Sequence, residues 1–94
     1  MQEDLSRQEW VLKKYFEDFQ PKNIYTWDDL EGYLTNFVQK MLLHSPENLL
    51  QVAYRLDLPE KEFTEAFYKQ DIKQIVCIII RKEKQRLEWR KKYQ

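Results

Sequence analysis

The sequence predicts an all-α fold, a compact bundle of about five helices that ends in a long C-terminal helix. Only one Gly and three Pro occur among the 94 residues, whereas a β fold needs Gly or Asn at most of its tight hairpin turns. Apolar residues also recur at steps of three and four, which is the period of an amphipathic helix. A chain of this length builds one core. We therefore expect a single domain over residues 1–94, with residues 81–94 as a basic helical extension.

The first predicted helix covers residues 6–19. Ser6 and Glu9 have the spacing of a capping box, in which each side chain satisfies a backbone N–H group at the helix start. Apolar residues follow at helical spacing, and most of them share one stripe: Trp10, Val11, Leu12, Tyr15, Phe16 and Phe19. Pro21 ends the segment, because a residue that precedes proline is pushed out of the α region.

The second and third helices are expected on either side of Pro46. Thr26 is the predicted N-cap of the second helix, and Asp28 and Asp29 lie in its first turn, where the helix dipole favours carboxylates. Its core-facing stripe is unbroken: Leu30, Tyr33, Leu34, Phe37, Val38, Met41 and Leu42. Ser45 is a predicted cap and Pro46 a favoured first residue for the third helix. The apolar residues of that helix are Leu49, Leu50, Ala53 and Leu56.

A short fourth helix leads into the long fifth one. Phe63, Ala66 and Phe67 form the apolar side of the fourth helix, and Asp71 is the predicted cap of the fifth. By propensity, the run IVCIII at residues 75–80 fits a buried strand as well as a helix. We expect a helix, because a lone strand has no other strand to pair with. The helical stripe also continues toward the C-terminus: Ile72, Ile75, Val76, Ile79, Leu87 and Arg90.

Catalytic, metal and cofactor sites are not expected. His44 and Cys77 are the only His and Cys residues and fall on different predicted helices, and structural zinc normally takes four such ligands. A single Gly cannot build a glycine-rich phosphate-binding loop. We therefore expect a protein that is not an enzyme and has no metal, no cofactor and no small-molecule substrate.

The composition predicts a cytoplasmic protein. A lone Cys cannot form an internal disulfide, which suits a reducing compartment. The N-terminus opens with Glu3 and Asp4, where a secretory signal would be basic and then apolar. The longest apolar run covers only residues 75–80, whereas a membrane span needs roughly 18 residues. We therefore expect no membrane partner.

The segment LQVAYRLDLPEKEFTEAF at residues 50–67 has a recognisable spacing of small, apolar and turn residues. Ala53 is a small residue in its first helix, Leu58 follows the turn, and Phe63 and Ala66 are apolar in its second helix. In this spacing the segment resembles the helix-turn-helix family of DNA-binding domains, although Asp57 stands where that family usually has Gly. The would-be recognition helix also carries three Glu against two Lys, which disfavours phosphate binding: Glu60, Glu62, Glu65, Lys61 and Lys69.

A wider likeness covers residues 49–93, with the stretches LLQVAYRLDLPEKEF and RKEKQRLEWRKKY. In these two stretches the chain resembles short, uncharacterised all-helical proteins of bacteria. The resemblance implies a stand-alone cytoplasmic helical protein. It implies no activity and no functional residues.

The C-terminal part of the chain concentrates the basic charge. Residues 81–94 hold seven basic and two acidic residues, a net charge of +5, so residues 1–80 carry −5. Such asymmetry favours binding to a partner or head-to-tail self-association. The run Ile78 to Ile80 spans roughly 200° of a helix, and we expect one stripe not to bury all three.

These features predict a non-enzymatic protein–protein interaction module, a small adaptor or regulatory protein that binds a protein partner or forms a homodimer. The alternative is a nucleic-acid-binding protein that uses the basic C-terminal helix together with the helix-turn-helix-like unit. The predicted partner-binding residues are Ile78, Ile80, Arg81, Lys84, Arg86, Trp89, Arg90 and Lys91.

Overall fold

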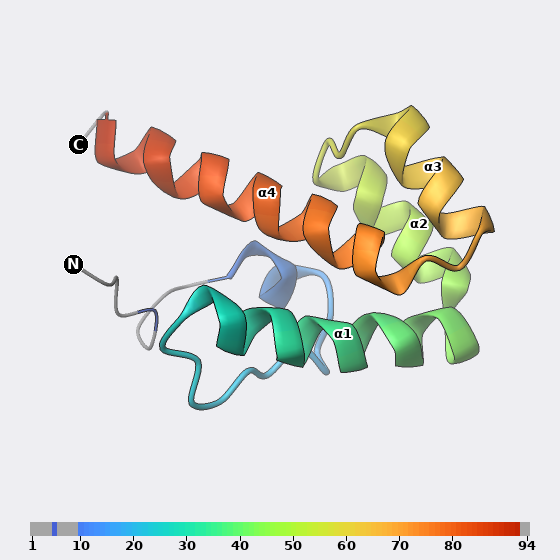
Figure 1. The fold of residues 1–94 in the computed structure, drawn as a ribbon, viewed down its shortest axis with the longest axis horizontal. Coiled ribbons are helices and arrows are strands. Elements are labelled where there is room, and N and C mark those ends of the chain that lie inside the picture. The colour runs from blue at the N-terminus through green and yellow to red at the C-terminus, as the bar shows by residue number, and fades with distance from the viewer. Residues whose placement is uncertain (1–4, 6–9, 93–94) are drawn as a thin grey trace.

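The computed structural model describes residue 5 and residues 10–92, which form four α-helices, one short 3-10 helix and no strand. The all-α prediction is confirmed, but the number of α-helices is four rather than five. The helices pack into a body of 37 × 26 × 22 Å (Figure 1). The elements are η1 (Val11–Lys14), α1 (Trp27–His44), α2 (Pro46–Arg55), α3 (Glu60–Tyr68) and α4 (Ile72–Lys92).

Helices α1 and α4 run in opposite directions along the long axis, while α2 and α3 cover one end of the pair (Figure 1). α4 packs against both α1 and α3, so side chains from two of its faces enter the core. Leu34 and Val38 on α1 meet this core, as do Ile75 and Ile78 on α4, and all four are fully buried.

The prediction of an α-helix over residues 6–19 is wrong within the described residues. Only the 3-10 helix Val11–Lys14 forms there, and the predicted cap Ser6 lies outside the described residues. Phe16 and Phe19 of the predicted stripe are nevertheless buried, and both pack edge-on against Phe37 of α1. A short helix has little stability of its own, and aromatic residues have modest helix propensity. The segment is therefore not held in a regular helix by local interactions, and its aromatic residues are buried by packing on α1 instead.

Helix α1 begins as predicted. The Thr26 hydroxyl accepts a hydrogen bond from the Asp29 N–H at 3.1 Å, and the Asp29 carboxylate accepts one from the Thr26 N–H at 3.1 Å. This reciprocal pair is a capping box. At the other end, Ser45 precedes α2 and Pro46 is its first residue, but no side-chain cap bond forms at Ser45.

Helices α2 and α3 end in the same way. After α2, the N–H of Leu58 bonds to the carbonyl of Ala53, and after α3 the N–H of Asp71 bonds to the carbonyl of Ala66. The residues before these donors, Asp57 and Gln70, both have a φ of 55°. This is the Schellman arrangement, in which a left-handed residue lets the last carbonyls of a helix find partners. At each of these two positions the chain changes direction, first between α2 and α3 and then between α3 and α4.

Residues 75–80 are helical, as predicted, and lie within α4. The Asp71 carboxylate accepts a hydrogen bond from the Gln74 N–H at 3.2 Å, which confirms Asp71 as the cap. The helix continues without interruption to Lys92. Within the described part of the chain, no helix combines the length and apolar character needed to cross a bilayer.

Candidate interaction groove between α1 and α4

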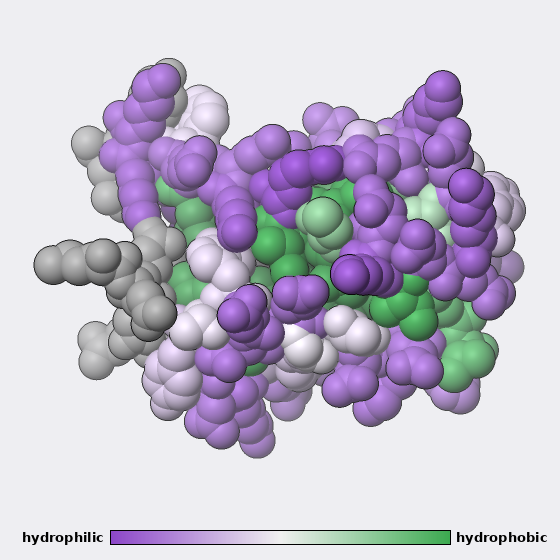
Figure 2. Space-filling view, viewed as in Figure 1, coloured by the Kyte–Doolittle hydropathy of each residue, from purple (hydrophilic) through white to green (hydrophobic). Residues whose placement is uncertain are grey.

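Three of the predicted partner-binding residues, Ile80, Arg81 and Lys84, line one open groove on α4. The groove has a volume of about 420 Å³ and lies along the seam between α4 and α1. Figure 2 shows apolar surface in this seam, bordered by hydrophilic side chains. The other lining residues are Val76, Cys77, Gln85 and Glu88 from α4 and Glu31 from α1.

The groove has an apolar floor and a rim of mixed charge. Val76 and Ile80 recur one turn apart on α4 and form the floor with Cys77, the single cysteine of the sequence. Cys77 is exposed, so its thiol is accessible from solvent. Two basic and two acidic residues surround this floor: Arg81, Lys84, Glu31 and Glu88.

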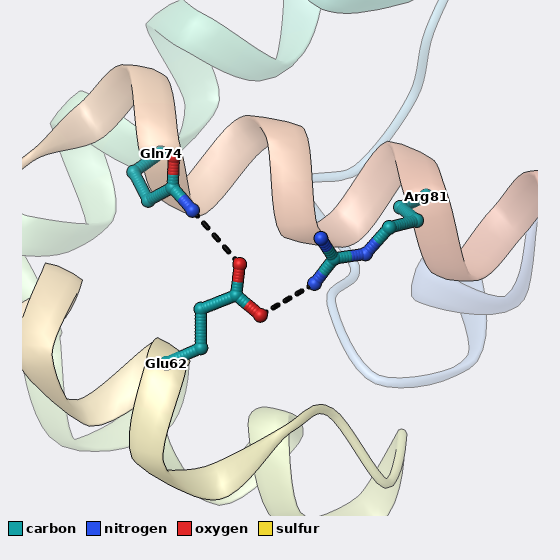
Figure 3. A network of polar contacts seen from close by, with 3 residues as sticks. All are labelled: Glu62, Gln74 and Arg81. Atoms are coloured by element: carbon teal, nitrogen blue, oxygen red, sulfur yellow. Dashed lines mark hydrogen bonds and ion pairs between the residues drawn. The ribbon is translucent and has the colours of Figure 1, made fainter.

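Arg81 is held in place by α3 (Figure 3). Its Nη2 atom donates to Oε2 of Glu62 at 2.6 Å, and the other carboxylate oxygen of Glu62 accepts a bond from Gln74 at 2.9 Å. The hydrogen bond and the charge of Glu62 raise the pKa of Arg81. The Arg81 side chain stays 47% exposed. It can therefore contact a partner while it ties α4 to α3.

Lys84 is held by α1. Its Nζ atom lies 5.2 Å from the centroid of the Trp27 ring, a cation–π contact. Trp27 in turn meets Trp10 edge-on, with 6.0 Å between the ring centroids. Both basic residues of the rim are thus oriented by contacts with other parts of the chain.

Ile78 is not available to a partner. It is 0% exposed in the core, whereas Ile80 is half-buried at the edge. Ile80 alone of residues 78–80 stays partly exposed, so the expectation that the three are not all buried holds, but Ile78 is not the residue left at the surface. Because the helix has neighbours on two sides, it buries Ile78 and Ile79 on different faces at once.

The remaining predicted residues do not line the groove. Arg86 pairs with the buried Glu83 at 2.8 Å, while Trp89 is 64% exposed and Arg90 and Lys91 are exposed in the last turns. Leu87 is buried as well. The first half of the predicted basic extension therefore packs against the protein through Glu83 and Leu87.

The predicted partner-binding residues omit four lining residues of α4: Val76, Cys77, Gln85 and Glu88. They also omit three residues of other helices that shape the groove: Glu31, Glu62 and Trp27. No local spacing in the sequence links these three residues to α4. The sequence shows only that Glu31 and Glu62 are acidic and that Trp27 is aromatic, so that each could attract a basic side chain of α4.

The two candidate reactive residues lie apart, since Cys77 lines the α1–α4 groove and His44 lines a different groove on α1. No cluster of three or more His, Cys, Asp or Glu side chains that could hold a metal ion occurs in residue 5 and residues 10–92.

The described residues form a small all-helical fold with an open groove between α1 and α4. No protein-family model, no curated protein and no solved structure matches the chain.

Proposed function

We propose that the protein is a non-enzymatic interaction module that binds a protein partner through the α1–α4 groove, and that a second copy of the chain is such a partner. The observation that carries the proposal is the apolar floor of Val76, Cys77 and Ile80 inside a charged rim. A small adaptor or regulatory protein of the cytoplasm fits this description, and the single cysteine suits a reducing compartment.

The charges of the rim favour a protein partner over a nucleic acid. Glu31 and Glu88 stand beside Arg81 and Lys84, so a chain of phosphates would meet repulsion as well as attraction. A two-fold dimer brings the same patch of both subunits together. A rim with two basic and two acidic residues can then pair with itself.

Sedimentation equilibrium over a range of protein concentrations tests this proposal. We expect the wild type to form a dimer and Cys77→Glu to be a monomer, because the new charge lies on the groove floor. Gln51→Glu adds the same charge at an exposed position of α2 and should dimerise like the wild type. A wild type that stays monomeric, or a Cys77→Glu variant that dimerises equally well, would contradict the self-association.

The single cysteine provides a second readout without any mutation. Dimerisation through the groove covers Cys77, so the rate of its alkylation by N-ethylmaleimide should fall as the protein concentration rises. A rate that does not depend on concentration would place the contact elsewhere on the surface.

Nucleic-acid binding is the second candidate. It is favoured by the turn between α2 and α3, where Asp57 adopts the left-handed backbone that the helix-turn-helix family usually gives to Gly. Against it, α3 and its C-cap expose Glu60 and Glu65 as well as Lys61 and Lys69. Titration with a mixed-sequence DNA duplex at low and moderate salt tests it, because binding through phosphates must weaken as salt increases.

A further inference from the structure

A second groove lies on another face of α1 and shares no lining residue with the α1–α4 groove. It has a volume of about 580 Å³, which falls in the range of roughly 300–1,000 Å³ that is common for ligand sites. Tyr33, Phe37 and Met41 form its half-buried apolar floor, and Asp18, Asn36 and Lys40 belong to its exposed rim. Because Asp18 comes from the segment before α1, sequence spacing alone does not indicate this site.

The aromatic floor is fixed by contacts on its inner side. The rings of Tyr33 and Phe37 are stacked, with 6.2 Å between centroids and an angle of 16°. Phe19 meets both rings edge-on at 5.3 Å. The Tyr33 hydroxyl accepts a bond from the Gln20 N–H at 2.8 Å and donates to the Asp18 carbonyl at 3.3 Å. A surface ordered in advance loses little freedom when a ligand binds.

Among the lining residues, which also include His44, the ammonium group that can pair with an anion is that of Lys40. It follows Phe37 by one turn on α1 and is exposed, and within the described residues it forms no ion pair. Asp18, another of the described residues, also lines the groove, but it forms no ion pair with Lys40. The Lys40 ammonium therefore remains available to an anion.

We propose that this groove binds a small aromatic carboxylate. The ring of the ligand lies against Tyr33, Phe37 and Met41, and its carboxylate pairs with the Lys40 ammonium. Contact between the ligand ring and the aromatic floor buries apolar surface and allows the rings to stack. The ion pair with Lys40 gives the preference for an anion. The site goes beyond the proposed interaction module, and either can exist without the other.

Two probes with the same ring test the proposal. Indole-3-acetate carries a carboxylate, whereas tryptamine carries an ammonium group on the same indole. In a titration followed by ¹H–¹⁵N NMR of the intact protein, indole-3-acetate should shift amide signals of residues 33–45 and saturate with a Kd of about 1 mM. Tryptamine should bind about fivefold more weakly, because exposed ion pairs contribute modestly.

The variant Lys40→Met keeps most of the apolar stem and removes the charge. It should bind both probes alike, whereas Lys73→Met, at an exposed position of α4, should keep the preference of the wild type. The spectra report at the same time whether each variant is folded. The proposal is overturned if neither probe gives saturable shifts, if the wild type binds both equally, or if Lys40→Met keeps the preference.

Discussion

Glu62 and Arg81 join α3 to α4 through a contact of 2.6 Å between Oε2 and Nη2. The same carboxylate accepts a hydrogen bond from Gln74, which precedes Arg81 by about two turns on α4. One acidic side chain of α3 therefore holds two positions of α4. It also fixes one of the basic residues on the rim of the α1–α4 groove.

Replacing Glu62 by Gln should lower the stability slightly at low salt and have less effect at high salt. The Arg81–Glu62 pair is partly exposed, so salt screens its attraction. Urea unfolding of wild type and variant at both salt concentrations measures the difference. Glu65→Gln is the control, since Glu65 is an exposed acid on the same helix. An effect of Glu62→Gln that is independent of salt would argue against an electrostatic tie.

Replacing Leu34 by Ala should lower the free energy of unfolding by about 2–5 kcal/mol. Leu34 is 0% exposed at the contact of α1 with α4, so its loss leaves a cavity. Leu43→Ala makes the same change on the same helix where the side chain is 72% exposed, and it should be nearly neutral. Chemical denaturation compares the two, and similar losses would mean that the face of α1 is assigned wrongly.

Replacing Gln70 by Gly should stabilise the protein by about 1 kcal/mol. Gln70 has a φ of 55° after α3, and a residue with a Cβ atom loses about 1–2 kcal/mol in the left-handed region. The opposite sign is expected for Gln51→Gly inside α2, where Gly lowers helix stability by about 1 kcal/mol. Thermal or urea unfolding shows both signs. A loss of stability in Gln70→Gly would contradict the Schellman arrangement.

The capping box at Thr26 should make the protein sensitive to acid. Hydrogen bonds from the N–H groups of Tyr25 and Thr26 lower the pKa of Asp29 below the ordinary value of an aspartate side chain. A carboxylate with a lowered pKa stabilises the fold above its unfolded-state pKa, and this contribution disappears as the pH falls through the folded-state pKa.

Asp29→Asn should therefore be less stable than the wild type at neutral pH, and the gap should close below about pH 4. Unfolding curves across this pH range measure the gap. Asp28→Asn is the matched control, because Asp28 lies next to Asp29 in the first turn but does not form the capping box. A gap that stays constant with pH would mean that the Asp29 charge does not support the cap.

Local patterns in the sequence determined where three of the four α-helices of the described residues begin. The capping box at Thr26, Pro46 at the start of α2 and the Asp71 cap of α4 all act between residues a few positions apart. Such signals can be recognised from the sequence alone, because the cap residue and the backbone N–H groups that it satisfies lie in the same turn. Residues 75–80 could be assigned to a helix for another reason, since a lone strand has no partner and the helical stripe continues toward the C-terminus.

The tertiary structure alone decided the rest. Phe16 and Phe19 are buried without a regular helix, because α1 supplies the rings on which they pack. Ile78 lies in the core rather than at a partner surface, because α4 has neighbours on two sides. Both grooves combine residues from separate segments. Periodicity shows which residues of a helix share a face, but the number of faces that are covered depends on packing between distant parts of the chain.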